Sequence, residues 1–269
     1  MDQATFHQFL VGAVNSGASD IHFKPGAAPA VRVNGELRPV RLPALAREDT
    51  VRIADHILAS ARWSGDRAAL HEVDTSYAVD GVGRFRASVF RQLGAIGVIL
   101  RAIPFHVPTL EGLGLPAVVQ KICNEDRGLI LVTGVTGSGK TSTLAAIVDY
   151  LNKTTRKHIL TIEDPVEYVH QDQYARITQR EIGPDTSSFA SALRSGLRQD
   201  PDVILVGEMR DHETIDIALK AAETGHLVLS TTHTTDAQRT ISRIVGAFPS
   251  DAEASVRIRW STPMAAEIP

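Results

Sequence analysis

A glycine-rich stretch in the middle of the chain has the residue types and the spacing needed to hold phosphate groups. Residues 134–141 read Gly-Val-Thr-Gly-Ser-Gly-Lys-Thr and match the pattern GxxxxGK followed by Ser or Thr. In such a loop the glycines let backbone N–H groups turn toward phosphate oxygens, and the helix that follows adds its positive end. Lys140 would neutralise the β- and γ-phosphates of ATP, and the hydroxyl of Thr141 would coordinate Mg²⁺. The expected nucleotide contacts are Gly134, Val135, Thr136, Gly137, Ser138, Gly139, Lys140, Thr141 and Ser142.

An acidic pair follows residues 159–162, where a strand is expected to end. Glu163 and Asp164 stand at this point, and Pro165 stops the strand. Carboxylates that follow parallel strands face the ligand crevice of the sheet. Either Glu163 or Asp164 is therefore a candidate to polarise a water molecule that attacks a γ-phosphate. The structural alternative is an ordinary acidic turn.

A second carboxylate follows the apolar run 203–206. Glu208 comes after this run and one glycine, so it lies at the expected carboxyl end of a strand. It would hold Mg²⁺ through a water molecule, because Mg²⁺ keeps much of its hydration shell. Asp202 precedes the run and therefore lies at the wrong end for the metal. The structural alternative for the next charged residues is a local ion pair between Arg210 and Asp211.

The elements that must position these residues alternate between strands and helices. Short apolar runs predict buried strands at 129–132, 159–162, 203–206 and 227–230. Helices are predicted from about residue 140, over 187–198 with Ser187 as its N-cap, over 211–225 and from about Asp236. This alternation predicts an α/β domain with a parallel sheet that is covered on both faces.

The first part of the chain has a different pattern. Helical spacing predicts helices over 5–16 and 51–61, and alternation predicts strands at 20–23, 30–33, 77–79, 84–90 and 97–103. Asn34-Gly35 predicts a tight hairpin turn. We therefore expect a small α+β domain over 1–105, a linker over 106–117, a phosphate-binding domain over 118–256 and a divergent tail over 257–269.

Composition narrows the class of protein. The chain has 269 residues, of which 43% are hydrophobic, and its formal net charge of −3 gives no reason to expect a nucleic-acid partner. A single cysteine, Cys123, rules out an internal disulfide and favours a reducing cytoplasm. The sequence shows no signal peptide and no run of 18 apolar residues, so we expect a cytoplasmic protein.

Taken together, the motifs resemble those of the secretion-ATPase superfamily of type II and type IV systems, and most of all the PilT family of type IV pilus retraction ATPases. The resemblance covers roughly residues 4–255. Residues 162–181 resemble the Asp box of the family, 200–211 its Walker B motif, and 225–234 its His box. It implies a RecA-like P-loop NTPase domain preceded by a small α+β, PAS-like N-terminal domain.

The resemblance also implies roles for particular residues. Glu163 would be the general base, and Glu208 the Walker B carboxylate that acts on magnesium through water. His226 and His233 would be the His-box residues that couple to the nucleotide at subunit contacts. The family carries arginines that close on the γ-phosphate from the N-terminal domain, and Arg86 and Arg101 fit those places. Weaker candidates for contacts with a neighbouring subunit are Arg176 and Arg180.

A function and partners follow from the same resemblance. It implies an ATP-hydrolysing, magnesium-dependent homohexameric motor that powers pilus retraction and twitching motility. Its partners would be an inner-membrane platform protein and related pilus ATPases, and it would touch the membrane only peripherally. The compact N-terminal domain and the lack of a tetracysteine zinc module favour the retraction branch over assembly ATPases.

The resemblance stops near Val256. The remaining residues contain Pro263 and Pro269, which disfavour a long final helix, so a truncated C-terminus is expected. Two alternatives to the retraction motor stay open at this point. One is a truncated, nucleotide-binding remnant without motor activity, and the other is a paralogous ATPase of type II secretion or of a pilus.

Overall fold

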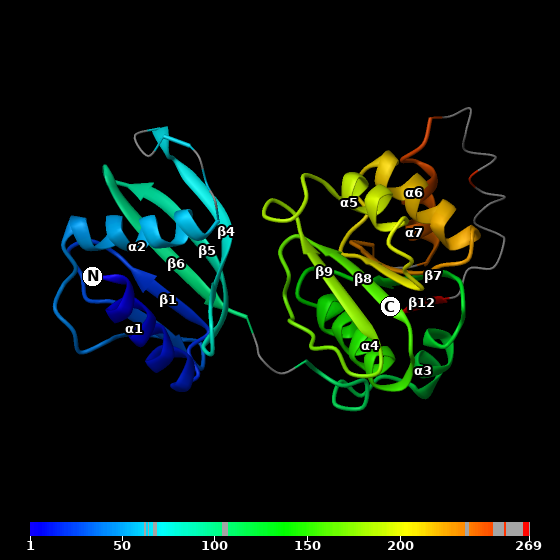
Figure 1. Cartoon of the computed structure of the whole chain (residues 1–269), viewed down its shortest axis with the longest axis horizontal. Coiled ribbons are helices and arrows are strands. Elements are labelled where there is room, and N and C mark those ends of the chain that lie inside the picture. Colours follow the sequence, from blue (N-terminus) through cyan, green and yellow to red (C-terminus); the bar gives the residue numbers. More distant parts are fainter. Residues whose placement is uncertain are drawn as a thin grey trace. The chain divides into compact units, whose positions relative to one another are not determined.

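Two separate sheets organise the chain. In the computed structural model the chain divides into two units, Met1–Phe105 and His106–Pro269, and each has its own sheet and core (Figure 1). The structure describes residues 1–61, 63, 65–66, 69–103, 107–234, 237–249, 256 and 266–268. The predicted helix start at Asp236 and nearly all of the predicted tail therefore lie outside the described residues.

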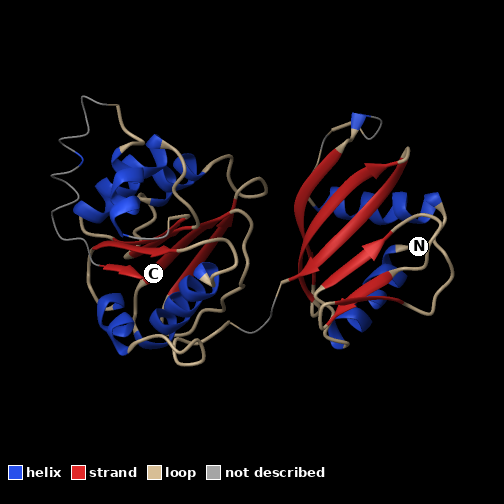
Figure 2. Cartoon of the chain, turned by 180° about the vertical axis from the view of Figure 1, so that it is seen from behind, coloured by secondary structure: helices blue, strands red, loops and turns tan. Residues whose placement is uncertain are grey.

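The first unit is an antiparallel sheet with two helices on one face (Figure 2). The strands lie in the order β3-β2-β1-β6-β5-β4. The elements are α1 (Gln3–Asn15), β1 (Asp20–Phe23), β2 (Ala30–Val33), β3 (Glu36–Pro39), α2 (Arg47–Ser60), β4 (Glu72–Val79), β5 (Gly83–Gln92) and β6 (Ala95–Ala102). The carboxylate of Asp2 caps α1 by accepting a hydrogen bond from the Thr5 N–H at 2.8 Å. Between β2 and β3, Asn34 and Gly35 have φ angles of 51° and 83°, which confirms the predicted tight turn.

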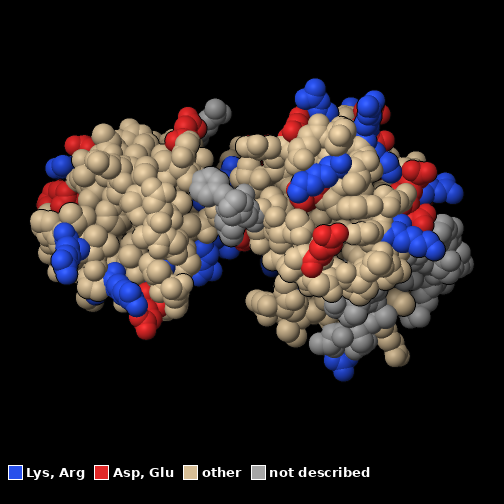
Figure 3. Space-filling model, turned by 90° about the horizontal axis from the view of Figure 1, so that it is seen from below, with Lys and Arg blue, Asp and Glu red and all other residues tan. Residues whose placement is uncertain are grey.

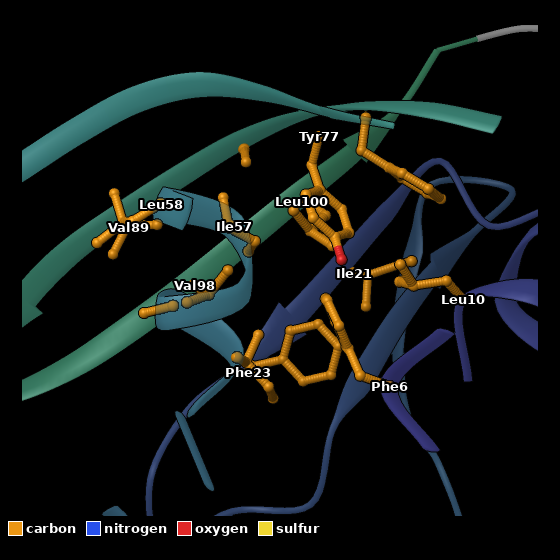
Figure 4. Close-up of a cluster of buried hydrophobic side chains, with 14 of the residues drawn as sticks. Phe6, Leu10, Ile21, Phe23, Ile57, Leu58, Tyr77, Val89, Val98 and Leu100 are labelled. Atoms are coloured by element: carbon orange, nitrogen blue, oxygen red, sulfur yellow. The ribbon is translucent and has the colours of Figure 1, made fainter. Parts of the chain in front are cut away.

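The core of the first unit lies between the helices and the sheet (Figure 4). It is built from alternate residues of the strands and from one face of each helix. Phe6 and Phe23 are buried there and meet edge to face, with ring centroids 5.6 Å apart. Truncating a phenylalanine in such a core costs about 3–5 kcal/mol, so this cluster is a main source of stability for the unit.

The second unit is a parallel sheet with helices on both faces, which confirms the predicted α/β class. The strands lie in the order β12-β7-β11-β10-β8-β9. The elements are α3 (Ala117–Cys123), β7 (Gly128–Thr133), α4 (Lys140–Thr154), β8 (His158–Glu163), β9 (Arg176–Glu181), α5 (Phe189–Gly196), β10 (Val203–Val206), α6 (His212–Glu223), β11 (Leu227–Thr232), α7 (Ala237–Val245) and β12 (Ala266–Ile268). One core cluster joins the sheet to α5, α6 and α7, and another joins it to α3 and α4.

The central strands of this sheet are buried along their whole length. All residues of β7, β10 and β11 are buried, as expected for strands with a helical layer on each side. Because the strands are parallel, the loops after β7, β8, β10 and β11 all leave the sheet at its carboxyl edge. The apolar runs of β7, β10 and β11 are each followed by glycine or polar residues and then by a helix, whereas β8 is followed by the edge strand β9.

Three local predictions need correction. The N-cap of α5 is Ser188, not Ser187, because the Ser188 hydroxyl accepts the hydrogen bond from the Ser191 N–H at 3.1 Å. Strand β9 was not predicted, because it is an edge strand with mostly polar residues. Strand β4 is longer than predicted and begins at Glu72.

The surface carries charges of both signs. On the face seen in Figure 3, basic and acidic side chains are interspersed over each unit. Several form local ion pairs, such as Arg38 with Glu36 and Lys220 with Asp216, both at 2.6 Å. Among the described residues, no helix is both long enough and apolar enough to cross a bilayer.

Candidate functional site

The glycine-rich loop connects β7 to α4 and has the backbone geometry of a phosphate cradle. Gly134, Gly137 and Gly139 have φ angles of 148°, 82° and 95°, which other residues rarely adopt. A Cβ atom added at Gly134 would lie 2.5 Å from the Ser138 hydroxyl oxygen. Gly139 is the N-cap of α4, so the loop ends at the positive end of that helix. The sequence requires glycine here because the chain turns back on itself within a few residues.

Lys140 begins helix α4 and folds back over the loop. Its ammonium nitrogen Nζ donates hydrogen bonds to the carbonyl oxygens of Gly134 at 2.8 Å and Val135 at 2.9 Å. The side chain is only 9% exposed, and burial lowers the pKa of the ammonium group below its usual value. The ammonium group of Lys140 therefore lies beside the backbone N–H groups of the loop, and a phosphate bound there could accept hydrogen bonds from both.

A cavity of about 420 Å³ lies at the carboxyl edge of the sheet, which is within the usual size range of small-molecule sites. Of the residues predicted from sequence, it brings together Thr136, Gly137, Gly139, Lys140, Thr141, Ser142, Glu163, Asp164, Glu208 and His233. The lining also includes Arg210, for which the sequence suggested only a local ion pair, and Thr161, Glu167, Tyr168, His170 and Phe189, to which it assigned no role at the site. The loop residues Gly134, Val135 and Ser138 stand outside this lining.

Glu163 ends strand β8, and its carboxylate accepts hydrogen bonds from two side chains and from the backbone of Glu167. Its carboxylate oxygen Oε1 accepts hydrogen bonds from the Thr161 hydroxyl at 2.6 Å and from the Gln179 amide at 3.3 Å. Burial raises the pKa of this carboxyl above its usual value, although the hydrogen bonds oppose that change. A carboxylate with a raised pKa is a better proton acceptor near neutral pH. Asp164 also lines the cavity but is exposed, so Glu163 is better suited to act as a base.

Glu208 follows strand β10 and lies between two basic side chains. Its oxygen Oε2 is 2.6 Å from the Arg210 guanidinium and 3.8 Å from Nε2 of His233. The structural alternative, a local ion pair of Arg210 with Asp211, is not the one seen, because Arg210 pairs with Glu208. Asp211 instead caps α6 by accepting hydrogen bonds from the N–H of Thr214 at 2.8 Å and from its hydroxyl at 2.7 Å. The carboxylate of Asp211 therefore caps the N-terminus of α6 and does not pair with Arg210.

Other predicted residues lie away from the cavity. His226 precedes β11 at the amino edge of the sheet, where its Nδ1 lies 3.0 Å from the Ala221 carbonyl oxygen. Arg180 donates to the Ser195 hydroxyl at 2.6 Å and to the Asp185 carbonyl at 3.1 Å. Arg176 pairs with Asp172 at 3.0 Å. The predicted roles of these three residues at subunit contacts stay predictions.

The two predicted arginines of the first unit are neighbours on its sheet. Arg86 of β5 and Arg101 of β6 are directly opposite each other in the antiparallel register. Arg101 forms an ion pair with Asp20 at 2.9 Å, and Asp20 in turn lies opposite it on β1. Arg86 is exposed. The residues that line the cavity all come from the second unit, and these arginines belong to the first.

The residues around the cavity fit a nucleotide with a magnesium ion. The loop offers backbone donors with a lysine, which suit phosphate oxygens. The Thr141 hydroxyl and the Glu208 carboxylate both line the same cavity, and they offer the oxygen ligands that Mg²⁺ prefers. A side chain at Gly134 would crowd Ser138, so the loop keeps the close approach that a bound phosphate needs.

Comparisons with known proteins identify relatives that are named as ATPases or as motility proteins. The sequence model of the family described as Type II/IV secretion system protein matches residues 3–248. A protein of Pseudomonas aeruginosa named as the type IV pilus retraction ATPase PilT is 48% identical over 250 residues, which are 93% of this chain and 72% of that protein. A twitching motility protein of Neisseria gonorrhoeae is 47% identical over 89% of this chain and 64% of its own length. The chain thus spans 64% to 72% of the length of these two relatives.

A solved structure is similar over nearly the whole chain. The crystal structure of the pilus retraction motor PilT with bound ADP has a TM-score of 0.90 and 45% sequence identity to this chain. The similarity covers 99% of this chain and 77% of that one. Both the fold of the two units and the order of their elements are therefore shared with a protein that binds an adenine nucleotide.

Proposed function

The chain belongs to the type II/IV secretion system protein family and is a PilT-like ATPase, and from this premise we propose that it is the motor of type IV pilus retraction. One observation carries the proposal: the same cavity is lined by residues of the phosphate-binding loop, Lys140 among them, and by Glu163 and Glu208. The similarity to proteins named for retraction and twitching motility favours this function over a remnant without motor activity or a type II secretion motor.

The phosphate groups of ATP would be held by the loop 134–141. Its backbone N–H groups would bind phosphate oxygens, and Lys140 would exchange its two carbonyl partners for the β- and γ-phosphates. Bound Mg²⁺ would neutralise charge on those phosphates. The Thr141 hydroxyl would hold the ion directly, and Glu208 would hold it through a water molecule.

Glu163 would take the proton of the attacking water. Hydrogen bonds from Thr161 and Gln179 support this role, because they fix the orientation of the carboxylate. The raised pKa also supports it, since a base with a pKa closer to neutrality accepts a proton more readily. His233 would act near the same phosphate through its position beside Glu208.

Two arginines of the first unit would complete the site. We assign Arg86 and Arg101 the role of balancing negative charge on the γ-phosphate in the transition state, which is worth several kcal/mol in other nucleotide hydrolases. Their pairing across β5 and β6 supports the assignment, because it presents two guanidinium groups on the same sheet face. Movement of one unit relative to the other would then couple hydrolysis to mechanical work.

The assembly would be a homohexamer at the cytoplasmic face of the inner membrane. Its partners would be an inner-membrane platform protein and related pilus ATPases. The similarity to a named pilus retraction motor supports this arrangement. The test is magnesium-dependent ATP hydrolysis per protein, measured as a function of protein concentration. Specific activity that rises with concentration is expected of a motor whose sites need neighbours. Nucleotide binding without hydrolysis at any concentration would contradict the proposal.

A further inference from the structure

Gln179 lies behind the proposed base, on the edge strand β9. It is directly opposite Thr161 of β8 in the parallel register, and it is absent from the residues that line the cavity. Its side chain is only partly exposed. Gln179 therefore stands next to the proposed chemistry without belonging to the surface that a nucleotide would touch.

Both the nitrogen and the oxygen of the Gln179 side-chain amide make hydrogen bonds. Its nitrogen Nε2 donates to the carboxylate of Glu163 at 3.3 Å and to the backbone carbonyl of Tyr168 at 2.9 Å. Its oxygen Oε1 accepts from the backbone N–H of His170 at 2.8 Å. These partners fix which end of the amide is nitrogen, because the reverse orientation would place an oxygen against two acceptors and a nitrogen against a donor.

Two donors from neighbouring strands meet at one oxygen of the base. The Thr161 hydroxyl lies 2.6 Å from Oε1 of Glu163, and the Gln179 amide approaches the same atom. A carboxylate held by two fixed donors loses much of its rotational freedom before any substrate arrives. Such preorganisation raises the rate of a step without any change in how tightly the substrate binds.

The same amide also anchors the segment that follows the base. Residues 168 and 170 are tied to β9 by Gln179, and the Val166 N–H donates to Glu181 of the same strand at 3.0 Å. At the other side of this segment, the Tyr168 hydroxyl lies 3.1 Å from the hydroxyl of Ser142. Ser142 follows the proposed magnesium ligand Thr141 in helix α4. A chain of hydrogen bonds thus runs from the base to the first turn of the phosphate-binding helix.

We propose that Gln179 is a positioning residue for hydrolysis: it orients the carboxylate of Glu163 and holds the 166–170 segment in register with helix α4. This inference rests on the proposed function of the site. It assigns Gln179 no contact with the nucleotide, so its effect belongs to the rate of the chemical step and not to nucleotide affinity.

The test compares Gln179→Met with the wild-type chain. Methionine has a similar volume and lacks both the donor and the acceptor. We expect kcat for ATP to fall about 10- to 100-fold, in the range seen when groups that orient a catalytic residue are removed. The dissociation constant for a fluorescent ATP analogue should stay within about twofold. Gln171→Met serves as the matched control, because Gln171 is an exposed glutamine in the same region and should keep wild-type kcat.

The pH dependence of kcat separates positioning from simple structural support. Loss of a donor that favours the ionised carboxylate raises the pKa of Glu163. The acidic limb of the kcat profile of Gln179→Met should therefore move to higher pH. Thr161→Val removes the second side-chain donor to Glu163, leaves the backbone donor Glu167 in place, and should move the limb in the same direction. It keeps the proposal testable where Gln179→Met does not fold.

The outcomes are distinguishable. Wild-type kcat in Gln179→Met, or a fall in kcat matched by an equal loss of nucleotide affinity with no movement of the acidic limb, would overturn the role of Gln179. Hydrolysis by the wild-type chain together with either result would leave the proposed ATPase intact. Absence of hydrolysis by the folded wild-type chain would overturn the proposed function itself.

Discussion

The two edges of the parallel sheet are built from the same strands, yet their polar side chains have different surroundings. At the amino edge, His158 begins β8, and Asp202 precedes β10. The carboxylate of Asp202 accepts from the His158 N–H at 2.7 Å, and the two ring nitrogens of His158 lie 3.1 Å from the Asp200 carbonyl and 2.9 Å from the Thr178 hydroxyl. These groups complete the hydrogen bonding of the sheet itself.

The carboxyl edge of the same strands holds charged groups around a cavity. Among the residues that the structure describes, the hydrogen-bond partners of the Lys140 ammonium group are carbonyl oxygens of its own loop, and Glu208 pairs with the neighbouring Arg210. Ligand atoms can replace such partners without breaking the sheet. A lysine, histidine or carboxylate near a strand end therefore indicates a role in chemistry only when it is known at which edge of the sheet the residue lies. Substitutions at the carboxyl edge should change activity, and those at the amino edge should change stability.

The largest contrast is expected between two lysines. Lys140→Met removes the cation of the phosphate loop, and ATP hydrolysis should fall by about a hundredfold or more, with loss of nucleotide binding. Lys157→Met, at the amino edge, removes an ion pair with Asp126 at 3.3 Å and should leave kcat within about twofold. Steady-state ATPase assays and binding of a fluorescent ATP analogue measure both variants. Equal losses of kcat in the two variants would contradict the assignment of activity to the carboxyl edge of the sheet.

Two acidic residues give the next contrast. Glu208→Gln should lower kcat about 10- to 100-fold, because the residue would orient a magnesium-bound water. Asp202→Ala should leave kcat unchanged and should lower the free energy of unfolding by about 1 kcal/mol, through loss of the hydrogen bond from His158. ATPase assays and urea unfolding of both variants test this pair. A strong loss of ATPase activity in Asp202→Ala with normal stability would refute the assignment of a structural role to the amino edge of the sheet.

A further prediction concerns the pH dependence of stability and one histidine, His170. Burial lowers the pKa of His170 to about 4, and its Nδ1 has no hydrogen-bond partner among the described residues. The nearby Asp149 and Lys153 act on the same ring with opposite signs. The unfolded state binds a proton near pH 6.5 and the folded state only near pH 4, so the contribution of neutral His170 is present above pH 6.5 and is lost as pH falls toward 4.

The measurement is the free energy of unfolding between pH 7 and pH 4. The His170→Gln variant should lack a part of the wild-type decrease, on the order of 2–3 kcal/mol. A slope unchanged in His170→Gln would show that burial of this ring does not set the pH dependence.

Local patterns allowed much of the second unit to be predicted. The phosphate loop is a contiguous motif between an apolar run and a helix, and Glu163 and Glu208 each follow an apolar strand, so no long-range information was needed to nominate them. Thr161 lies two residues before Glu163 on the same face of its strand, and that spacing could have indicated their contact.

Other features depend on contacts between distant segments. Strand β9 has an edge position and few apolar residues, so its pattern did not predict a strand. The Asp-box resemblance covered Gln179 but gave it no role. The sequence suggested an ion pair between the neighbours Arg210 and Asp211 as the structural alternative. Sequence distance does not reveal that the Asp211 carboxylate caps a helix and that Arg210 pairs with Glu208. His226 and His233 lie seven positions apart in one motif, but β11 separates them onto opposite edges of the sheet.

The most direct test of the account is the Glu163→Gln variant, assayed beside Asp202→Asn. Both changes remove one charge from an acidic residue at a strand end, but at opposite edges of the same sheet. We expect Glu163→Gln to bind the ATP analogue with wild-type affinity and to lose about 10²- to 10⁴-fold in kcat, as for removal of a general base. Asp202→Asn should hydrolyse ATP at the wild-type rate. Comparable rates in the two variants would contradict the proposal that ATP is hydrolysed at the carboxyl edge with Glu163 as base.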